Sequence, residues 1–137
     1  MKVYFACSIK GGGDSSHYIT ILEAIKNAGG DVLSEIFVHD AINLGGSPLP
    51  PAEIYARDIS MINDADVVIA EVSNPSLGVG YELAYAEKLG RPILCLFNKE
   101  SGGHLSAMVS GNSYNSVVQF DQTTLPSAIK DFLTQTR

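Results

Sequence analysis

Two acidic residues occupy positions where a carboxylate could do chemistry, and the first of them is Asp58. Asp58 falls on the apolar face of a helix predicted over residues 52–65. The apolar members of that face are Ile54, Met61, Ile62 and Ala65. Because a buried carboxylate is costly unless it is paired, Asp58 either acts on a substrate or is neutralised by Arg57 or Lys10.

The second candidate is Glu82, which follows the glycine-rich segment 78–80 and is expected in the first turn of a helix over residues 78–89. The helix dipole alone is an ordinary reason for an acidic residue in a first turn. Glu71, inside the preceding predicted strand, is the alternative carboxylate. Two carboxylates that converge on one site suit glycosidic chemistry, one as nucleophile and one handling protons.

The elements that must position these residues alternate between short apolar runs and amphipathic stretches. Strands are predicted over residues 3–7, 31–38, 66–72, 93–97 and 116–120. Helices are predicted over 15–28, 52–65, 78–89 and 125–134, with a long loop over 40–51. This pattern predicts an α/β fold: a doubly wound, flavodoxin-like or Rossmann-like five-stranded parallel sheet with helices on both faces, in a single domain over 1–137. Such sheets bind ligands at the carboxyl ends of their strands.

Three segments that follow predicted strands are rich in glycine and serine: residues 8–13, 73–82 and 98–104. The first leads into a helix N-terminus, where backbone N–H groups and the helix dipole favour anions. Ser8 and Lys10 could add a hydroxyl and a cation, although a plain turn is the alternative. The segment fits neither the dinucleotide-binding pattern nor the P-loop, so neither ligand class is indicated.

Composition excludes several classes of protein. The formal net charge of −6 argues against a nucleic-acid polymer as partner, and no apolar run is long enough to span a membrane. The histidines, His17, His39 and His104, lack metal-ligand spacing, so neither a metal nor another cofactor is expected. Cys7 and Cys95 lie in apolar runs, and the N-terminus lacks the long apolar stretch of a signal peptide, which predicts a reduced, cytoplasmic protein.

Three segments together carry a family resemblance: VYFACSIKGGG, ARDISMINDADVVIAEVSNPSLGVGYELAYA, and ILCLF followed by SGGHLSAM. They resemble the nucleoside 2-deoxyribosyltransferase superfamily, and within it the 2′-deoxynucleoside 5′-monophosphate N-glycosidases, over nearly the whole chain. The resemblance implies hydrolysis of a nucleotide to free base and 2-deoxyribose 5-phosphate through a glycosyl ester on a glutamate. Base exchange by a transferase is the nearest alternative, and a non-catalytic nucleotide-binding module is another.

The resemblance also implies roles for individual residues. Glu82 corresponds to the nucleophile, Asp58 to the carboxylate that assists proton transfer to the base, and Tyr4 to a tyrosine that positions the nucleophile. The positions that match substrate and phosphate contacts are Ser8, Ile9, Lys10, Gly11, Gly12, Ser76 and Gly78. Ser106 and Met108 match residues that reach the neighbouring site across a homodimer interface.

The sequence departs from the family pattern at three places. Lys10 stands where close relatives often have arginine, which keeps the charge but loses bidentate phosphate contact. The segment SEIFVHD lacks an expected Glu-His pair, although His39 lies three residues beyond Ile36. The segment NPSLGVGYE lacks the acidic residue and Gly-Thr of the transferases, and its serine favours a phosphorylated 5′ end.

Overall fold

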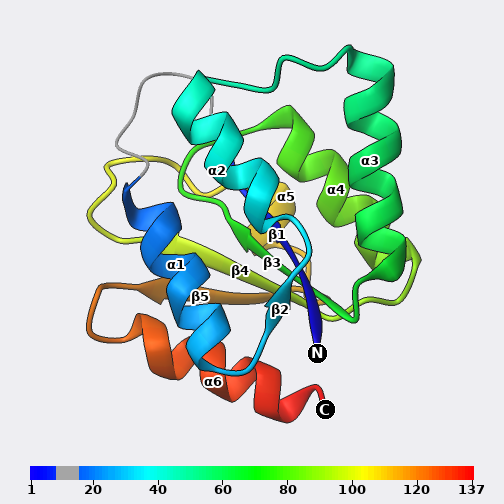
Figure 1. Ribbon diagram of the computed structural model, residues 1–137. Helices are drawn as coiled ribbons and strands as arrows, with labels where there is room; N and C mark the ends of the chain where they lie inside the picture. The colour runs from blue at the N-terminus through cyan, green and yellow to red at the C-terminus, as the bar shows by residue number, and fades with distance from the viewer. Residues whose placement is uncertain (9–15) are drawn as a thin grey trace.

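The computed structural model describes residues 1–8 and 16–137, which form a five-stranded sheet in the order β2-β1-β3-β4-β5 (Figure 1). The strands are β1 (Lys2–Ala6), β2 (Asp31–Val32), β3 (Val67–Glu71), β4 (Ile93–Asn98) and β5 (Ser116–Phe120). Every neighbouring pair is parallel. The predicted doubly wound parallel sheet is confirmed, and its strand order reverses between β1 and β3, where such folds bind ligands.

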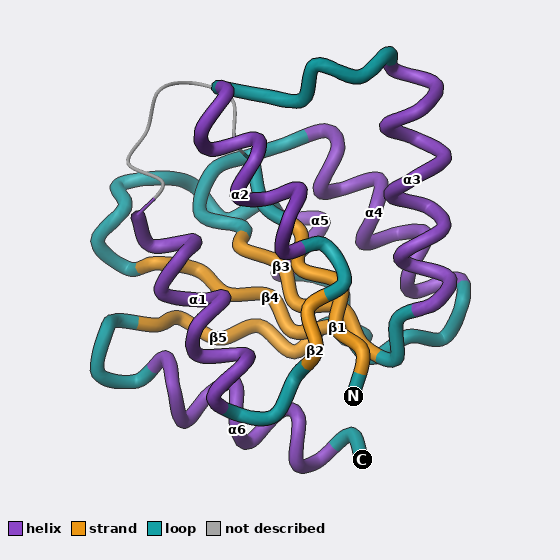
Figure 2. Tube along the Cα trace, in the orientation of Figure 1, coloured by secondary structure: helices purple, strands orange, loops and turns teal. Residues whose placement is uncertain are grey.

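Helices cover both faces of this sheet (Figure 2). They are α1 (Ser16–Asn27), α2 (Glu35–Leu44), α3 (Pro51–Asp64), α4 (Leu77–Lys88), α5 (Ala107–Ser110) and α6 (Leu125–Gln135). Side chains of α1 and α6 share one buried cluster with the sheet, and side chains of α3, α4 and α5 share the other. None of the helices in the described ranges combines the length and apolar character needed to cross a bilayer.

Strand β1 contributes side chains to both faces. Val3 and Phe5 belong to the cluster under α1 and α6, whereas Tyr4 and Ala6 belong to the cluster under α3 and α4. Alternate residues of a strand point to opposite faces, so this division follows from the strand geometry. It directs Tyr4 toward the helix that carries Glu82.

The predicted strand over residues 31–38 is wrong beyond its first two residues. Ser34 is buried, and its hydroxyl accepts from the Phe5 N–H at 3.0 Å and donates to the Phe5 carbonyl at 2.9 Å. A side chain thus bonds the backbone of β1 just beyond the short ladder with β2. The chain then turns into α2, which buries Val38 and Ala41. Because α2 extends to Leu44, the predicted loop over 40–51 shortens to residues 45–50. The short helix α5 was also not predicted.

Candidate active site

Tyr4, Asp58 and Glu82 line one cavity of about 90 Å³. They come from β1, α3 and α4, which are far apart in the sequence and adjacent around the sheet. Phe37 of α2 and Arg57 of α3 line the same cavity. The structure therefore brings together the three residues for which the sequence predicted catalytic roles, and adds an aromatic ring and a cation to them.

The Tyr4 hydroxyl donates a hydrogen bond to Glu82 Oε2. The pKa of Glu82 is raised to about 7: burial is the largest cause and the negative charge of Asp58 acts in the same direction, while the Tyr4 hydrogen bond and the Arg57 charge oppose them. Burial also raises the pKa of Tyr4, with the charge of Glu82 as the next cause, so this phenol stays a hydrogen-bond donor. The pair supplies a carboxylate that titrates near neutrality, held by a neutral donor.

The position of Glu82 within its helix differs from the prediction. Ser76 caps α4, because its side-chain oxygen accepts from the Val79 N–H at 3.3 Å, and the helix begins at Leu77. Glu82 is consequently the sixth helical residue, in the second turn rather than the first. The favourable dipole interaction of a first turn therefore does not account for this carboxylate.

Asp58 is paired with Arg57, the partner that the sequence suggested as an alternative to a catalytic role. Arg57 Nε donates to Asp58 Oδ1 at 2.8 Å, and the two side chains are 21% and 24% exposed. Both residues nevertheless line the cavity, so pairing does not remove Asp58 from the site. Lys10, the other partner considered, lies outside the described residues.

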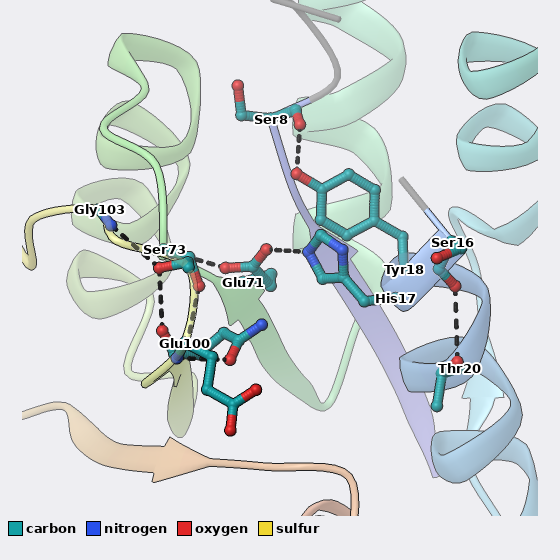
Figure 3. A network of polar contacts seen from close by, with 11 residues as sticks. Ser8, Ser16, His17, Tyr18, Thr20, Glu71, Ser73, Glu100 and Gly103 are labelled. Atoms are coloured by element: carbon teal, nitrogen blue, oxygen red, sulfur yellow. Dashed lines mark hydrogen bonds and ion pairs between the residues drawn. The ribbon is translucent and has the colours of Figure 1, made fainter. Parts of the chain in front are cut away.

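Glu71 faces a different set of partners, which Figure 3 shows at close range. Its Oε2 lies 2.5 Å from His17 Nε2, and its Oε1 accepts from the Ser73 N–H at 2.5 Å. Burial by itself raises the pKa of Glu71, but the hydrogen bonds from His17 and Ser73 outweigh it, and the pKa lies below its usual value. Glu71 is not among the described residues that line the cavity of Tyr4 and Glu82, and its two oxygens contact His17 and Ser73 instead.

Most of the Gly-rich segment predicted to bind phosphate lies outside the described residues. Ile9, Lys10, Gly11 and Gly12 lie outside the described residues. Ser8 is described: it is half-buried beside the cavity-lining Cys7, and its carbonyl accepts from the Tyr18 hydroxyl at 2.5 Å. The roles of this segment in substrate binding stay predictions.

Ser76, Ser106 and Met108 line a second cavity, of about 440 Å³. Ser106 caps α5, since its hydroxyl oxygen accepts from the Met108 N–H at 3.2 Å. Gly78 lies in the first turn of α4, exposed to solvent. The structure thus gathers Ser76 with Ser106 and Met108, but places them in a cavity separate from Tyr4, Asp58 and Glu82 within one chain.

Two cavity residues have no site role predicted from the sequence: Phe37, and Arg57, which was expected only as a partner that neutralises Asp58. Phe37 was missed because residues 31–38 were predicted to form a strand. Helical spacing could have found it, since Phe37 lies one turn before Ala41, which α2 buries. Within residues 1–8 and 16–137, no three His, Cys, Asp or Glu side chains are grouped so that they could hold a metal ion.

Known proteins resemble this chain in sequence and in fold. A protein of Syntrophotalea carbinolica, provisionally named 2′-deoxynucleoside 5′-phosphate N-hydrolase 1, is 39% identical over 99% of this chain and 96% of its own. The 5-hydroxymethyl-dUMP N-hydrolase of Mus musculus is 43% identical over 86% of this chain and 69% of its own. The structure of the Clostridium botulinum CMP N-glycosidase BcmB shares the fold, with a TM-score of 0.64, 16% identity and coverage of 96% of this chain and 99% of that one.

The family model described as nucleoside 2-deoxyribosyltransferase matches residues 3–117, a range that begins in β1 and ends in β5. It includes the three cavity-lining residues Tyr4, Asp58 and Glu82, so the match extends over the whole candidate site. The chain belongs to the nucleoside 2-deoxyribosyltransferase family.

Proposed function

We propose that this protein hydrolyses the N-glycosidic bond of 2′-deoxynucleoside 5′-monophosphates to the free base and 2-deoxyribose 5-phosphate. The observation that carries the proposal is the hydrogen bond from the Tyr4 hydroxyl to Glu82 in a cavity that Asp58 also lines. The names of the relatives at 39% and 43% identity support the same reaction.

The reaction runs in two displacements. Glu82 attacks C1′ of the deoxyribose, and the C1′–N bond breaks with its electron pair on the base. The base takes a proton through Asp58, while Tyr4 holds Glu82 in position. Water then attacks C1′ of the ester, Glu82 leaves as a carboxylate, and Asp58 recovers the proton from that water. A 2′-deoxy sugar favours this route, because the absent hydroxyl makes the oxocarbenium-like transition state less unfavourable.

The 5′-phosphate is held, in this proposal, by local groups that offset the overall negative charge. Ser76 stands at the N-terminus of α4, where backbone N–H groups and the helix dipole favour an anion. Ser8, Ile9, Lys10, Gly11 and Gly12 supply backbone donors, a hydroxyl and a cation from the loop after β1. Gly78 allows the phosphate to approach the first turn of α4.

The active unit is proposed to be a homodimer in which Ser106 and Met108 of one copy reach the site of the other. Met108 is 85% exposed and Leu77 is 97% exposed, an unusual state for large apolar side chains. Both residues line the cavity that contains Ser76, so a second copy seated there would cover them and complete the phosphate site. The protein is proposed to act in the cytoplasm, which fits its free cysteines, Cys7 and Cys95.

Base exchange is the second candidate, because the matching family model is described as a transferase. In that reaction another free base, rather than water, would attack the ester on Glu82. The two candidates differ only in the second displacement, so one assay can separate them.

The test is a panel of deoxynucleoside 5′-monophosphates and their nucleosides, scored by chromatography for released base. We expect faster release from the monophosphates, and loss of release in Glu82→Ala with the fold retained. The exposed Glu23→Ala on α1 is the matched control and should keep wild-type activity. Full activity in Glu82→Ala would overturn the proposal.

Two further arms of the panel test the alternatives. A different free base is added to each reaction, and a new nucleoside or nucleotide would establish transfer, whereas free sugar phosphate establishes hydrolysis. Stable nucleotide binding without base release from any substrate would instead identify a binding module.

A further inference from the structure

Arg57 is a charged residue of the cavity to which the proposed reaction gives no role. Its guanidinium is held on two sides: Nε donates to Asp58 Oδ1 at 2.8 Å, and Cζ lies 4.2 Å from the centroid of the Phe37 ring. A guanidinium over an aromatic face gains cation–π attraction. The two contacts fix the cation next to the carboxylate that serves the leaving base.

The terminal nitrogens of Arg57 are available to a ligand. In residues 1–8 and 16–137 the guanidinium makes one hydrogen bond, the bond from Nε to Asp58. The buried nitrogen found there without a partner belongs to Arg91 instead, so Nη1 and Nη2 of Arg57 are not sealed in the core. Both nitrogens carry N–H donors and can bond an oxygen in the cavity.

Arg57 is also the one cation among the described residues that line this cavity. Its charge acts on Glu82, whose pKa it lowers against the effects of burial and of Asp58. The cavity therefore contains two carboxylates and one guanidinium. Until Asp58 delivers its proton, the leaving base carries an electron pair in this cavity, and Arg57 is the cation of the described lining that can offset that charge.

We propose that Arg57 stabilises the departing base by donating hydrogen bonds from its terminal nitrogens to the carbonyl oxygen beside the glycosidic nitrogen. The inference rests on the proposed glycosidase function. As the C1′–N bond breaks and the Glu82–C1′ bond forms, the electron pair moves onto the base and is shared with that oxygen. Hydrogen bonds to a group that gains charge are stronger in the transition state than in the bound substrate, so they accelerate the step.

A purely structural role for Arg57 makes a different prediction. If Arg57 only positions Asp58, its loss should slow all substrates by the same factor. If it stabilises charge on the base, its loss should slow a substrate with a poor leaving group more than one with a good leaving group. The two roles are therefore separable by changing the base alone.

The experiment compares dUMP with 5-fluoro-dUMP, whose base is nearly the same shape but leaves more readily because its N1 is more acidic. Values of kcat/KM for both are measured in wild type, Arg57→Gln, Arg57→Lys and Phe37→Leu. Arg91→Gln, two residues before β4 begins, is the matched control. Thermal unfolding of each variant checks that its fold is intact.

We expect Arg57→Gln to lose about 100-fold with dUMP and less than about 10-fold with 5-fluoro-dUMP. Arg57→Lys and Phe37→Leu should shift the same ratio by smaller factors, and either tests the inference if Arg57→Gln does not fold. Equal losses for the two substrates, or no loss, would overturn the inference while the glycosidase function stands. Release of base by the wild type from other monophosphates but not from these two would also overturn the inference, and absence of release from the whole panel would overturn the function itself.

Discussion

The hydrogen bond between Tyr4 and Glu82 makes a quantitative prediction for the variant Tyr4→Phe. The substitution removes only the hydroxyl and leaves the aromatic ring in the buried cluster. Since that hydrogen bond lowers the pKa of Glu82, its loss should raise the pKa above the present value of about 7. A nucleophilic carboxylate acts only when it is ionised, so activity near neutrality should fall.

The magnitude follows from the strength of the bond. A hydrogen bond to a charged group contributes about 1.5–3 kcal/mol, and about 1.4 kcal/mol corresponds to a tenfold change in ionisation. The pKa of Glu82 should therefore move from about 7 to roughly 8–9. At pH 7 the ionised fraction would drop from about one half to between roughly one tenth and one hundredth, a loss of about 5- to 50-fold.

The assay is the pH dependence of kcat/KM for a deoxynucleoside monophosphate between about pH 5 and pH 10. Wild type should lose activity as the pH falls through about 7, and Tyr4→Phe should lose activity at a higher pH. At high pH the kcat/KM values of the two proteins should approach each other. Tyr114→Phe, which removes a hydroxyl that bonds the Arg91 carbonyl, is the control and should follow wild type. A loss of the same size at every pH would refute the reasoning.

Four further variants, one of them with a matched control, test stability and assembly. Glu82→Gln should stabilise the protein at pH 8 by up to roughly 3 kcal/mol and not at pH 4, because a folded-state pKa raised from 4.5 to about 7 costs stability as the pH rises through that window. Glu71→Gln should destabilise the protein by about 1–3 kcal/mol at pH 7 and by less at pH 4, because the fold lowers the pKa of Glu71. Denaturant titration of both variants, Glu82→Gln and Glu71→Gln, at each pH checks these two predictions. A change in stability that does not depend on pH would contradict them. Met108→Lys should convert the proposed dimer to monomer in sedimentation and reduce activity, and an unchanged dimer would count against the interface. Gly103→Ala should cost about 1–3 kcal/mol, since its Cβ would lie 2.1 Å from the Ser73 carbonyl oxygen, whereas Gly80→Ala, with open space around it, should not.

The sheet could be predicted because its central strands are buried on both faces. The run of residues 67–71 is buried at every position, so its sequence is continuously apolar apart from Glu71. The position of Asp58 could also be predicted, since helical spacing places this residue beside the apolar residues of α3. Tyr4, Asp58 and Glu82 could be named as a set only through the family resemblance, because no local pattern links β1, α3 and α4.

What could not be predicted depends on contacts between distant segments. The apolar run after Asp31 suits a strand locally, but Ser34 bonds the backbone of β1 and α2 follows instead. The start of α4 is displaced by one residue because Ser76 caps it, and Glu82 is the sixth helical residue, in the second turn. Propensity cannot decide such cases, because tertiary bonds outweigh the small local preferences.

The mistaken strand also concealed the environment of Asp58. From the sequence, a pairing with Arg57 and a role in chemistry were alternatives, because a neutralised carboxylate needs no further explanation. The structure places Phe37 of α2 under the Arg57 guanidinium, and all three side chains line one cavity. A salt bridge that served stability alone would be better placed away from a cavity that also contains Glu82, since the charge of Asp58 raises the pKa of Glu82. The pair is therefore better explained as part of the site, where Arg57 offsets the charge that Asp58 adds.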